Sequence, residues 1–183
     1  MAIRYIENPS LEVQLESVHN FPFSIQYIKN PSLEVQLVEV KQDGYSIIDI
    51  ANPSLEVQLA AVRQTGHVIR FIENPSLEVQ LAAVKQAGSA IQHIKNPSLE
   101  VQLEAVEKEP AAIEYIENPS LKVQFKAVKR YKWAISSIKN PALEVQYYVI
   151  KKDPNMYRLI NNIHRKALHS HEFLTDHERF GKQ

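Results

Sequence analysis

The sequence predicts an all-α protein, an α-solenoid of seven 22-residue two-helix repeats with a capping half-repeat at each end. Three observations lead to this prediction: the segment NPSLEVQL recurs at a fixed spacing of 22 residues, each copy carries helix-start signals, and its apolar residues follow a helical period. Two copies vary, as NPSLKVQF and NPALEVQY. The seven repeats begin at Asn8, Asn30, Asn52, Asn74, Asn96, Asn118 and Asn140.

The first helix of each repeat is expected to begin at the Asn-Pro pair. Asn accepts hydrogen bonds from the free amides of a first helical turn, Pro has no amide hydrogen to leave unpaired, and the Glu at position 5 complements the positive end of the helix. In the first repeat, Leu11, Leu15 and Val18 lie at i, i+4 and i+7 on one face, flanked by Val13. This pattern predicts a helix of about eleven residues that buries its leucines.

The second helix of each repeat is expected to begin at position 15, where glycine and proline alternate between repeats. Proline fixes φ near −65°, so a backbone conformation that suits both residues has a negative φ. The preceding residue is the expected N-cap, and about six or seven helical residues follow, which bury two isoleucines three apart. The residues concerned are Gly44, Gly66, Gly88, Pro22, Pro110, Pro154 and Lys132, with Asp43, Thr65 and Asp153 as caps and Ile25 and Ile28 as the buried pair.

Incomplete units flank the seven repeats. Ile3, Tyr5 and Ile6 match the end of a preceding unit, and Asn162 begins an eighth unit that decays at once. We therefore expect a helical repeat solenoid over residues 1–161 and a degenerate C-terminal cap and tail over residues 162–183. The tail histidines lack a closed set of ligands and predict a polar cap, not a metal site. They are His164, His169, His171 and His177.

The motif NPSLEVQLAAVKQAGSAIQHIKNPSLEVQL resembles the short helical repeats of bacteria and their viruses, a family of unknown function rich in AAVKQNG-x-A-I/L-x-Y phrases. The resemblance extends from Ile3 to about Asn162. It implies a HEAT-like α-solenoid and supplies no catalytic residues.

Residues that stay the same in the repeats are interpreted as framework. The glutamines at position 7 are expected to bond the backbone of the next repeat, and the serines at position 3 to bond within the first helical turn. The glutamates at position 5 meet the same environment five times, which does not separate an acid from a base. No catalytic residue, cofactor or metal is expected, and the protein is predicted not to be an enzyme. Position 22 predicts salt bridges between adjacent repeats, through Glu73, Lys95, Glu117 and Lys139.

Positions 16 and 20 vary between repeats and carry most of the aromatic residues. They are i and i+4 on the second helix, so we expect them to share a face and to form a concave aromatic stripe that binds a partner. A covering of the core edge is the alternative interpretation. The candidate binding residues are Phe23, Tyr27, Tyr45, His67, Phe71, His93, Tyr115 and Trp133.

Charge separates the two ends of a chain whose net charge is zero: residues 1–117 hold 8 Lys and Arg against 16 Asp and Glu, and residues 118–183 hold 13 against 5. The sixth repeat carries cations at i, i+4, i+7 and i+8. This pattern fits a solvated face, a site for an acidic protein partner, or a phosphate-binding surface with interleaved aromatic rings. The basic patch comprises Lys122, Lys126, Lys129, Arg130, Lys132, Lys151 and Lys152.

Composition narrows the functional classes. The chain has no cysteine and no apolar stretch of the roughly 18 to 20 residues that cross a bilayer, so we expect a cytoplasmic protein without a membrane partner. The predicted function is a non-enzymatic protein-binding scaffold, for instance a bacterial or phage modulator of a host protein. The alternative is a nucleic-acid-associated protein that uses the basic patch. Polar end caps predict mainly a monomer, with weak salt-sensitive self-association.

Overall fold

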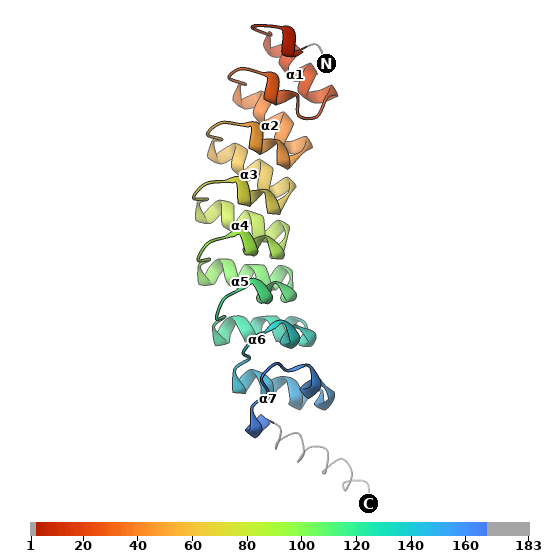
Figure 1. Ribbon diagram of the computed structural model, residues 1–183, viewed down its shortest axis with the longest axis vertical. Helices are drawn as coiled ribbons and strands as arrows, with labels where there is room; N and C mark the ends of the chain where they lie inside the picture. The colour runs from red at the N-terminus through yellow and green to blue at the C-terminus, as the bar shows by residue number, and fades with distance from the viewer. Residues whose placement is uncertain (1–2, 168–183) are drawn as a thin grey trace, which may run out of the picture. The chain divides into compact units, whose positions relative to one another are not determined.

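A computed structural model describes residues 3–167 of the chain, and these residues form an all-α repeat protein without a β-strand. The predicted α-solenoid is confirmed. Each repeat pairs one α-helix with one short 3-10 helix, and the chain divides into two compact units, Met1–Lys95 and Asn96–Gln183. Within each unit, successive α-helices lie side by side in one layer and the 3-10 helices form a second layer against them (Figure 1).

The helices recur with the period of the sequence. The α-helices are α1 Leu11–Asn20, α2 Leu33–Gln42, α3 Leu55–Gln64, α4 Leu77–Gln86, α5 Leu99–Lys108, α6 Leu121–Arg130 and α7 Leu143–Lys152. The 3-10 helices are η1 Ile3–Tyr5, η2 Ser24–Tyr27, η3 Gly44–Asp49, η4 Gly66–Phe71, η5 Gly88–His93, η6 Pro110–Tyr115, η7 Lys132–Ser137 and η8 Pro154–Leu159.

The α-helices begin three residues later than the Asn-Pro pair, so the prediction of Asn as the cap is wrong. The serine at position 3 is the N-cap, and its hydroxyl accepts from the amide of the valine at position 6, as Ser76 does from Val79 at 3.3 Å. Asn instead adopts the left-handed conformation, with φ of 47° at Asn74, which asparagine tolerates better than most residues. The other asparagines with this conformation are Asn30, Asn52, Asn96, Asn118 and Asn162.

The buried face of the α-helices also differs from the prediction. Leu11 is 46% exposed, whereas the valines at position 6 are fully buried from the second repeat onward. Positions 6, 10 and 11 face the core, and position 10 is a fully buried alanine in four repeats. The isoleucines at position 18, within the second helix, and at position 21, directly after it, complete the core as predicted, for example Ile25 and Ile28.

The second helices confirm most of the prediction for position 15. Six of them begin at that position, and no glycine among the described residues has a positive φ. Asp43 and Asp153 cap η3 and η8 through their carboxylates, whereas Thr65 makes no capping bond. The first repeat differs, because Phe23 takes a left-handed φ of 64° and η2 begins only at Ser24.

Gly44 and Gly66, at position 15, lie against the backbone of the next α-helix. A Cβ atom on Gly66 would lie 2.5 Å from the carbonyl oxygen of Ala83. The Gly66 amide donates to Oε1 of Gln86 at 2.8 Å, and the Gln86 side chain in turn donates to the carbonyl of Gln64 at 3.3 Å. The same arrangement joins Gly44 to the third repeat. Close approach, and not an unusual φ, is therefore the reason for glycine here.

The glutamines at position 7 are framework residues, as expected, but their commonest bond stays within the repeat. The Gln58 amide donates to the carbonyl of Pro53 at 2.8 Å, and the other repeats do the same. The predicted bond to the next repeat is made by Oε1 of Gln124, which accepts from the amide of Ala142, and by Oε1 of Gln146, which accepts from the amide of His164.

Helix α7 offers a direct test of the cap, because its N-cap is Ala142 and has no side-chain capping bond. Its φ of −60° and ψ of 148° lie close to those of the capping serines. We expect Ala142→Ser to raise the free energy of unfolding by about 1 kcal/mol, measured by urea denaturation followed by circular dichroism. Ser76→Ala should lower it by a similar amount. A destabilising Ala142→Ser would contradict this assignment of the cap.

Candidate functional site

The aromatic stripe of the first unit is a set of rings in contact across neighbouring repeats. Tyr45 of η3 meets Phe71 of η4 edge to face, with ring centroids 6.2 Å apart. The guanidinium of Arg70 lies 4.5 Å from the centroid of Phe71 and 5.7 Å from that of Tyr45. Tyr45 and Phe71 nevertheless remain 39% and 37% exposed, so their outer faces are available to a partner.

A histidine pair continues this surface into the fourth repeat. The rings of His67 and His93 are 5.4 Å apart and nearly perpendicular, and Ser89 Oγ lies 3.4 Å from Nε2 of His67. Burial, followed by the nearby His67 and Arg70, lowers the pKa of His93 below its ordinary value of 6.5. His93 is therefore an uncharged, half-buried ring at neutral pH.

The remaining stripe residues lie at the surface of their own units. Phe23 precedes η2 and Tyr27 ends it. In the second unit Tyr115 ends η6 and Trp133 lies in η7, with the Lys132 ammonium 5.8 Å from its ring. Each of these four rings is exposed. The structure thus places every predicted stripe residue on or beside a 3-10 helix and leaves each at least partly accessible.

The shared face of positions 16 and 20 was predicted for an α-helix, whereas the second helices are 3-10 helices with three residues per turn. Residues four apart therefore point in different directions. The observed contacts join position 16 of one repeat to position 20 of the next, as in Tyr45 with Phe71 and His67 with His93. The stripe consequently depends on stacking between repeats.

The basic patch is partly neutralised by acidic residues of neighbouring repeats. Glu107 of α5 pairs with Lys126 and lies 3.9 Å from Arg130. The hydrogen bond from Lys126 lowers the pKa of Glu107, so the carboxylate stays charged. Lys132 pairs with Asp153 at 2.7 Å and lowers the pKa of Asp153 in the same way.

The other four cations of the patch have no ion pair within the described residues. Lys129 lies over two rings, 5.3 Å from the centroid of Phe125 and 6.0 Å from that of Tyr148. Lys122 is exposed at the N-terminal end of α6. Lys151 and Lys152 are exposed at the C-terminal end of α7. Three free lysines and one stacked lysine make a smaller phosphate-binding surface than the sequence suggests.

The predicted salt bridges at position 22 do not form in residues 3–167. No ion pair joins Glu73 to Lys95 or Glu117 to Lys139, although all four side chains are exposed. The ion pairs that link neighbouring repeats come from positions 9, 12, 13, 14 and 15 instead. Exposed charges gain little from pairing, so a sequence alternation alone is a weak predictor.

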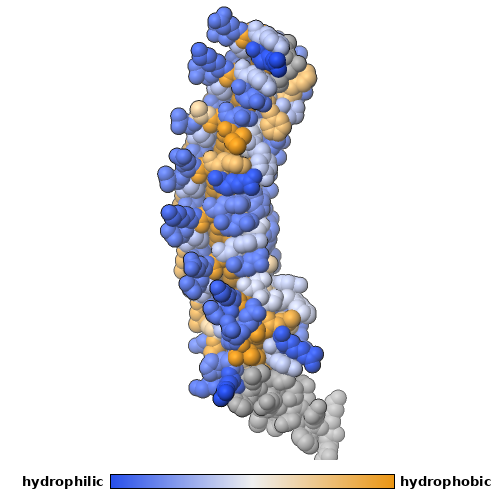
Figure 2. Space-filling model, in the orientation of Figure 1, coloured by the Kyte–Doolittle hydropathy of each residue, from blue (hydrophilic) through white to orange (hydrophobic). Residues whose placement is uncertain are grey.

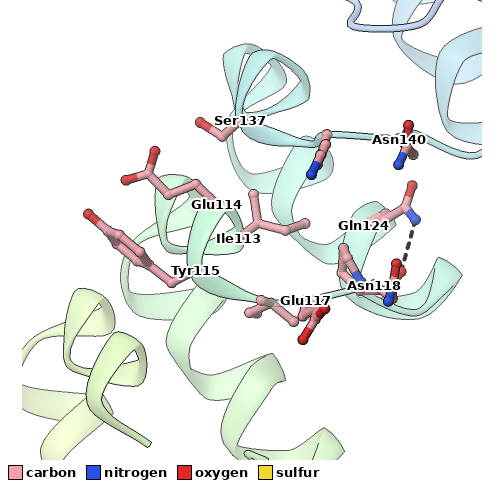
Figure 3. A pocket seen from close by; sticks show the side chains of 11 residues that line it. Ile113, Glu114, Tyr115, Glu117, Asn118, Gln124, Ser137 and Asn140 are labelled. Atoms are coloured by element: carbon pink, nitrogen blue, oxygen red, sulfur yellow. Dashed lines mark hydrogen bonds between the residues drawn. The ribbon is translucent and has the colours of Figure 1, made fainter.

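A polar pocket of about 490 Å³ opens in the second unit between the fifth and sixth repeats. Glu114, Tyr115 and Ser137 lie at one side of it, and Asn118, Asn140 and Gln124 at the other (Figure 3). Gln124 is nearly buried, but both ends of its amide are already bonded to the backbone. The pocket therefore presents no unsatisfied buried group to a ligand.

Sequence reasoning missed a row of exposed leucines at the first residue of the α-helices. Each is 43% to 47% exposed in repeats one to six, and Figure 2 shows hydrophobic residues at the surface of both units. A helical period marks a face but does not distinguish its centre from its edge, which explains the error. The row comprises Leu11, Leu33, Leu55, Leu77, Leu99 and Leu121.

Glu39 is a second feature that the sequence analysis did not single out. It occupies position 10, where most repeats have a small residue, and it is 1% exposed. Its Oε1 accepts from the amide of Phe23 at 2.6 Å and from Ser46 Oγ at 3.0 Å, whereas Oε2 has no hydrogen-bond partner. Burial raises the pKa of Glu39 above its ordinary value of 4.5, and the charges of Asp43 and Asp49 add to the increase.

This raised pKa gives stability a definite pH dependence. The folded state holds the Glu39 proton more tightly than the unfolded state, so the stabilisation is complete below the ordinary carboxyl pKa and is lost as the pH rises through the folded value. We expect Glu39→Gln to gain stability relative to the wild type as the pH rises from about 4 to about 7, measured by urea denaturation. Asp49→Asn should change in the same direction, because burial also raises the pKa of Asp49. A stability difference that stays constant over this range would contradict the prediction.

No group of three or more His, Asp or Glu side chains among residues 3–167 is arranged to hold a metal ion. His169, His171 and His177 lie outside the described residues. None of the helices in that same range has the length and apolarity to span a bilayer.

No family model, curated protein or solved structure matches the chain. The resemblance to the short helical repeats therefore remains an interpretation of the motif.

Proposed function

We propose that this chain is a non-enzymatic protein-binding repeat scaffold that contacts its partner through the aromatic stripe of the 3-10 layer. The observation that carries the proposal is the exposure of rings at variable positions of a fixed framework. The polar side chains that recur in the repeats already form hydrogen bonds within the protein, as the capping serines and the glutamines at position 7 illustrate. The rings, by contrast, keep an accessible face, as Tyr45 and Phe71 do although they contact each other across repeats.

The composition of the stripe supports this proposal. Tyr45, Tyr115 and Trp133 are large rings with a polar atom, and Arg70 adds a cation that has no acidic partner within 4 Å in the described residues. Such residues are enriched where binding energy concentrates in protein interfaces. The resemblance to bacterial and viral repeats favours a modulator of a host protein, and the absence of cysteine fits a cytoplasmic location.

A selection experiment tests this proposal. The full chain is used to select binders from a displayed library of protein fragments, and the binders are then measured against two triple variants. The first changes the stripe through Tyr45→Ser, Phe71→Ser and Trp133→Ser. The second is a control of similar fractional exposure in the α-helical layer, Leu33→Ser, Leu77→Ser and Leu121→Ser.

We expect selected binders to lose at least about tenfold in affinity for the stripe variant and to keep their affinity for the control, because ring contacts are costly to remove. Equal binding to both variants would overturn the stripe as the contact surface. A selection without enrichment would overturn the protein-binding function itself.

Nucleic-acid association is the second candidate, favoured by Lys122, Lys151 and Lys152, which have no ion pair in the described residues. The pairing of Lys126, Arg130 and Lys132 with Glu107 and Asp153 counts against it. Fluorescence anisotropy with labelled single-stranded DNA and RNA separates the two functions. The scaffold proposal expects weak binding that disappears near physiological salt of about 0.15 M. Tight binding at that salt concentration would favour the nucleic-acid function.

A further inference from the structure

We infer that the groove between α5 and α6 is a docking site for an amphipathic α-helix of a partner protein. The groove has a volume of about 520 Å³, and Leu103 and Phe125, both half-buried, form its apolar floor. Its two walls carry opposite charge. The acidic wall on α5 comprises Glu100, Glu104 and Glu107, and the basic wall on α6 comprises Lys122, Lys126 and Lys129.

The separation of charge comes from departures from the repeat pattern. Position 5 is Glu in the other six repeats but Lys122 in the sixth, which leaves α6 as the one α-helix of the described residues without an acidic residue in its first turn. Position 12 is His, Lys or Arg in the first four repeats but Glu107 in the fifth. Both residues carry the charge that the helix dipole disfavours at their place in the helix, so neither is explained by helix stability.

The charges at one end of the groove are free to meet a ligand. The pair between Lys126 and Glu107 joins the walls toward the C-terminal end of α5. Glu100, Glu104 and Lys122 have no ion pair within the described residues. An approaching helix therefore meets two unpaired carboxylates on one side and an unpaired ammonium on the other.

The floor is built for an apolar contact. Phe125 replaces the leucine that occupies position 8 in the first five repeats, and Tyr148 of α7 supports it edge to face with centroids 5.7 Å apart. The Lys129 ammonium lies near both rings, 5.3 Å from the centroid of Phe125 and 6.0 Å from that of Tyr148. These two contacts fix the orientation of Phe125 and leave part of the ring exposed in the groove.

The shape and charge of the groove define its occupant. Two adjacent packed helices present a straight channel with axes about 8 to 10 Å apart, which suits the apolar stripe of a third helix. The walls extend over positions 5 to 12, about 10 Å of helix at 1.5 Å per residue, or two turns. The occupant is thus a helix with apolar side chains at i, i+3, i+4 and i+7, basic residues on the flank against α5, and acidic residues on the flank against α6.

The first unit contains an internal comparison. A groove of about 450 Å³ lies along α4 beside Arg63 of α3, lined by Arg63, Glu78, Leu81, Ala82, Lys85 and Gln86. It has no ring on its floor, and both of its helices carry a glutamate at position 5 and a cation at position 12. Charge separation and an aromatic floor are therefore not requirements of stacking.

The inference rests on the proposed function in one respect, that the partner is a protein. The site itself is separate, because the groove lies in the α-helical layer and the stripe on the 3-10 helices.

The test uses the full chain and a designed, fluorescently labelled helical peptide. The peptide carries leucines at i, i+3, i+4 and i+7, lysines along one flank and glutamates along the other. Anisotropy titrations compare the wild type with Lys122→Glu, which restores the residue of the other repeats, and with Phe125→Leu. The matched control is Glu78→Lys, at the same repeat position in the α3–α4 groove.

We expect Lys122→Glu to weaken binding about tenfold and Phe125→Leu about fivefold, with no change in Glu78→Lys. A second peptide with lysines on both flanks should bind Lys122→Glu more tightly than the wild type. Absence of binding to the wild type at about 1 mM peptide, or equal effects of Lys122→Glu and Glu78→Lys, would overturn the site. Neither result bears on partners selected through the stripe, so failure of the groove is distinguishable from failure of the scaffold function.

Discussion

Ile69→Ala is expected to lower the free energy of unfolding by about 3 kcal/mol. Ile69 lies in η4, is 1% exposed, and packs in the layer between the 3-10 helices and the α-helices. Removing its side chain leaves a cavity in a stacked array whose layers cannot easily collapse, so both the lost burial and the cavity contribute. Urea denaturation monitored by circular dichroism measures the loss.

Leu77→Ala is the matched comparison, because a leucine of almost the same volume lies eight residues away and is 47% exposed. Its substitution should cost about 1 kcal/mol or less, since much of its surface is already in water. The sequence pattern predicted that both side chains are buried, which would make the two losses similar. Equal losses for the two variants would show that the leucine row packs in the core after all.

Gly66→Ala is expected to destabilise the protein by about 2 kcal/mol. The added methyl group would lie 2.5 Å from the Ala83 carbonyl oxygen and 2.9 Å from Gln86 Oε1. Relief of either contact requires α4 to move away from η4, which also weakens the hydrogen bond from the Gly66 amide to Gln86. The measurement is again the free energy of unfolding in urea.

A double variant identifies the contact that matters. Gln86→Ala removes the side-chain contact but leaves the backbone carbonyl of Ala83 in place. The glycine is required by the backbone approach, so Gly66→Ala should remain destabilising in the Gln86→Ala background. Full rescue there would show that the glutamine side chain, and not the backbone, excludes a methyl group.

The repeat itself accounts for how much of the fold is predictable from the sequence. A segment that recurs every 22 residues must place equivalent residues in equivalent environments, so the number of repeats, the position-15 start of most second helices and the buried isoleucines follow directly. Six second helices begin at position 15 as predicted.

Details that depend on the type of helix and on contacts between neighbouring repeats could not be predicted from the sequence. A six-residue segment such as Gly44–Asp49 gives no sequence signal that separates a 3-10 helix from an α-helix, and the difference changes which side chains meet. Asn74 was interpreted as a cap because asparagine serves both as a cap and as a left-handed residue. Only the three-dimensional arrangement distinguishes the two roles.

The candidate site was likewise predictable from the sequence only in part. Variable rings at positions 16 and 20 were found from the sequence alone, and the structure leaves all of them partly accessible. The pairing of Lys126 and Arg130 with Glu107 was not predictable, because it depends on which residues of adjacent helices face each other. Position 10 holds a small residue in most repeats but Glu39 in the second. This difference was the sequence signal that could have identified the buried carboxyl group.

Isothermal titration calorimetry with a selected protein partner tests the central claim most directly. The claim is that binding energy is concentrated in exposed rings of the 3-10 layer, with Tyr45, Tyr115 and Trp133 as the principal contacts. At least one of the three single alanine variants should weaken binding by about 2 kcal/mol or more, close to thirtyfold, while Leu77→Ala binds as the wild type does. Affinities within about twofold of the wild type for all three ring variants would contradict the account.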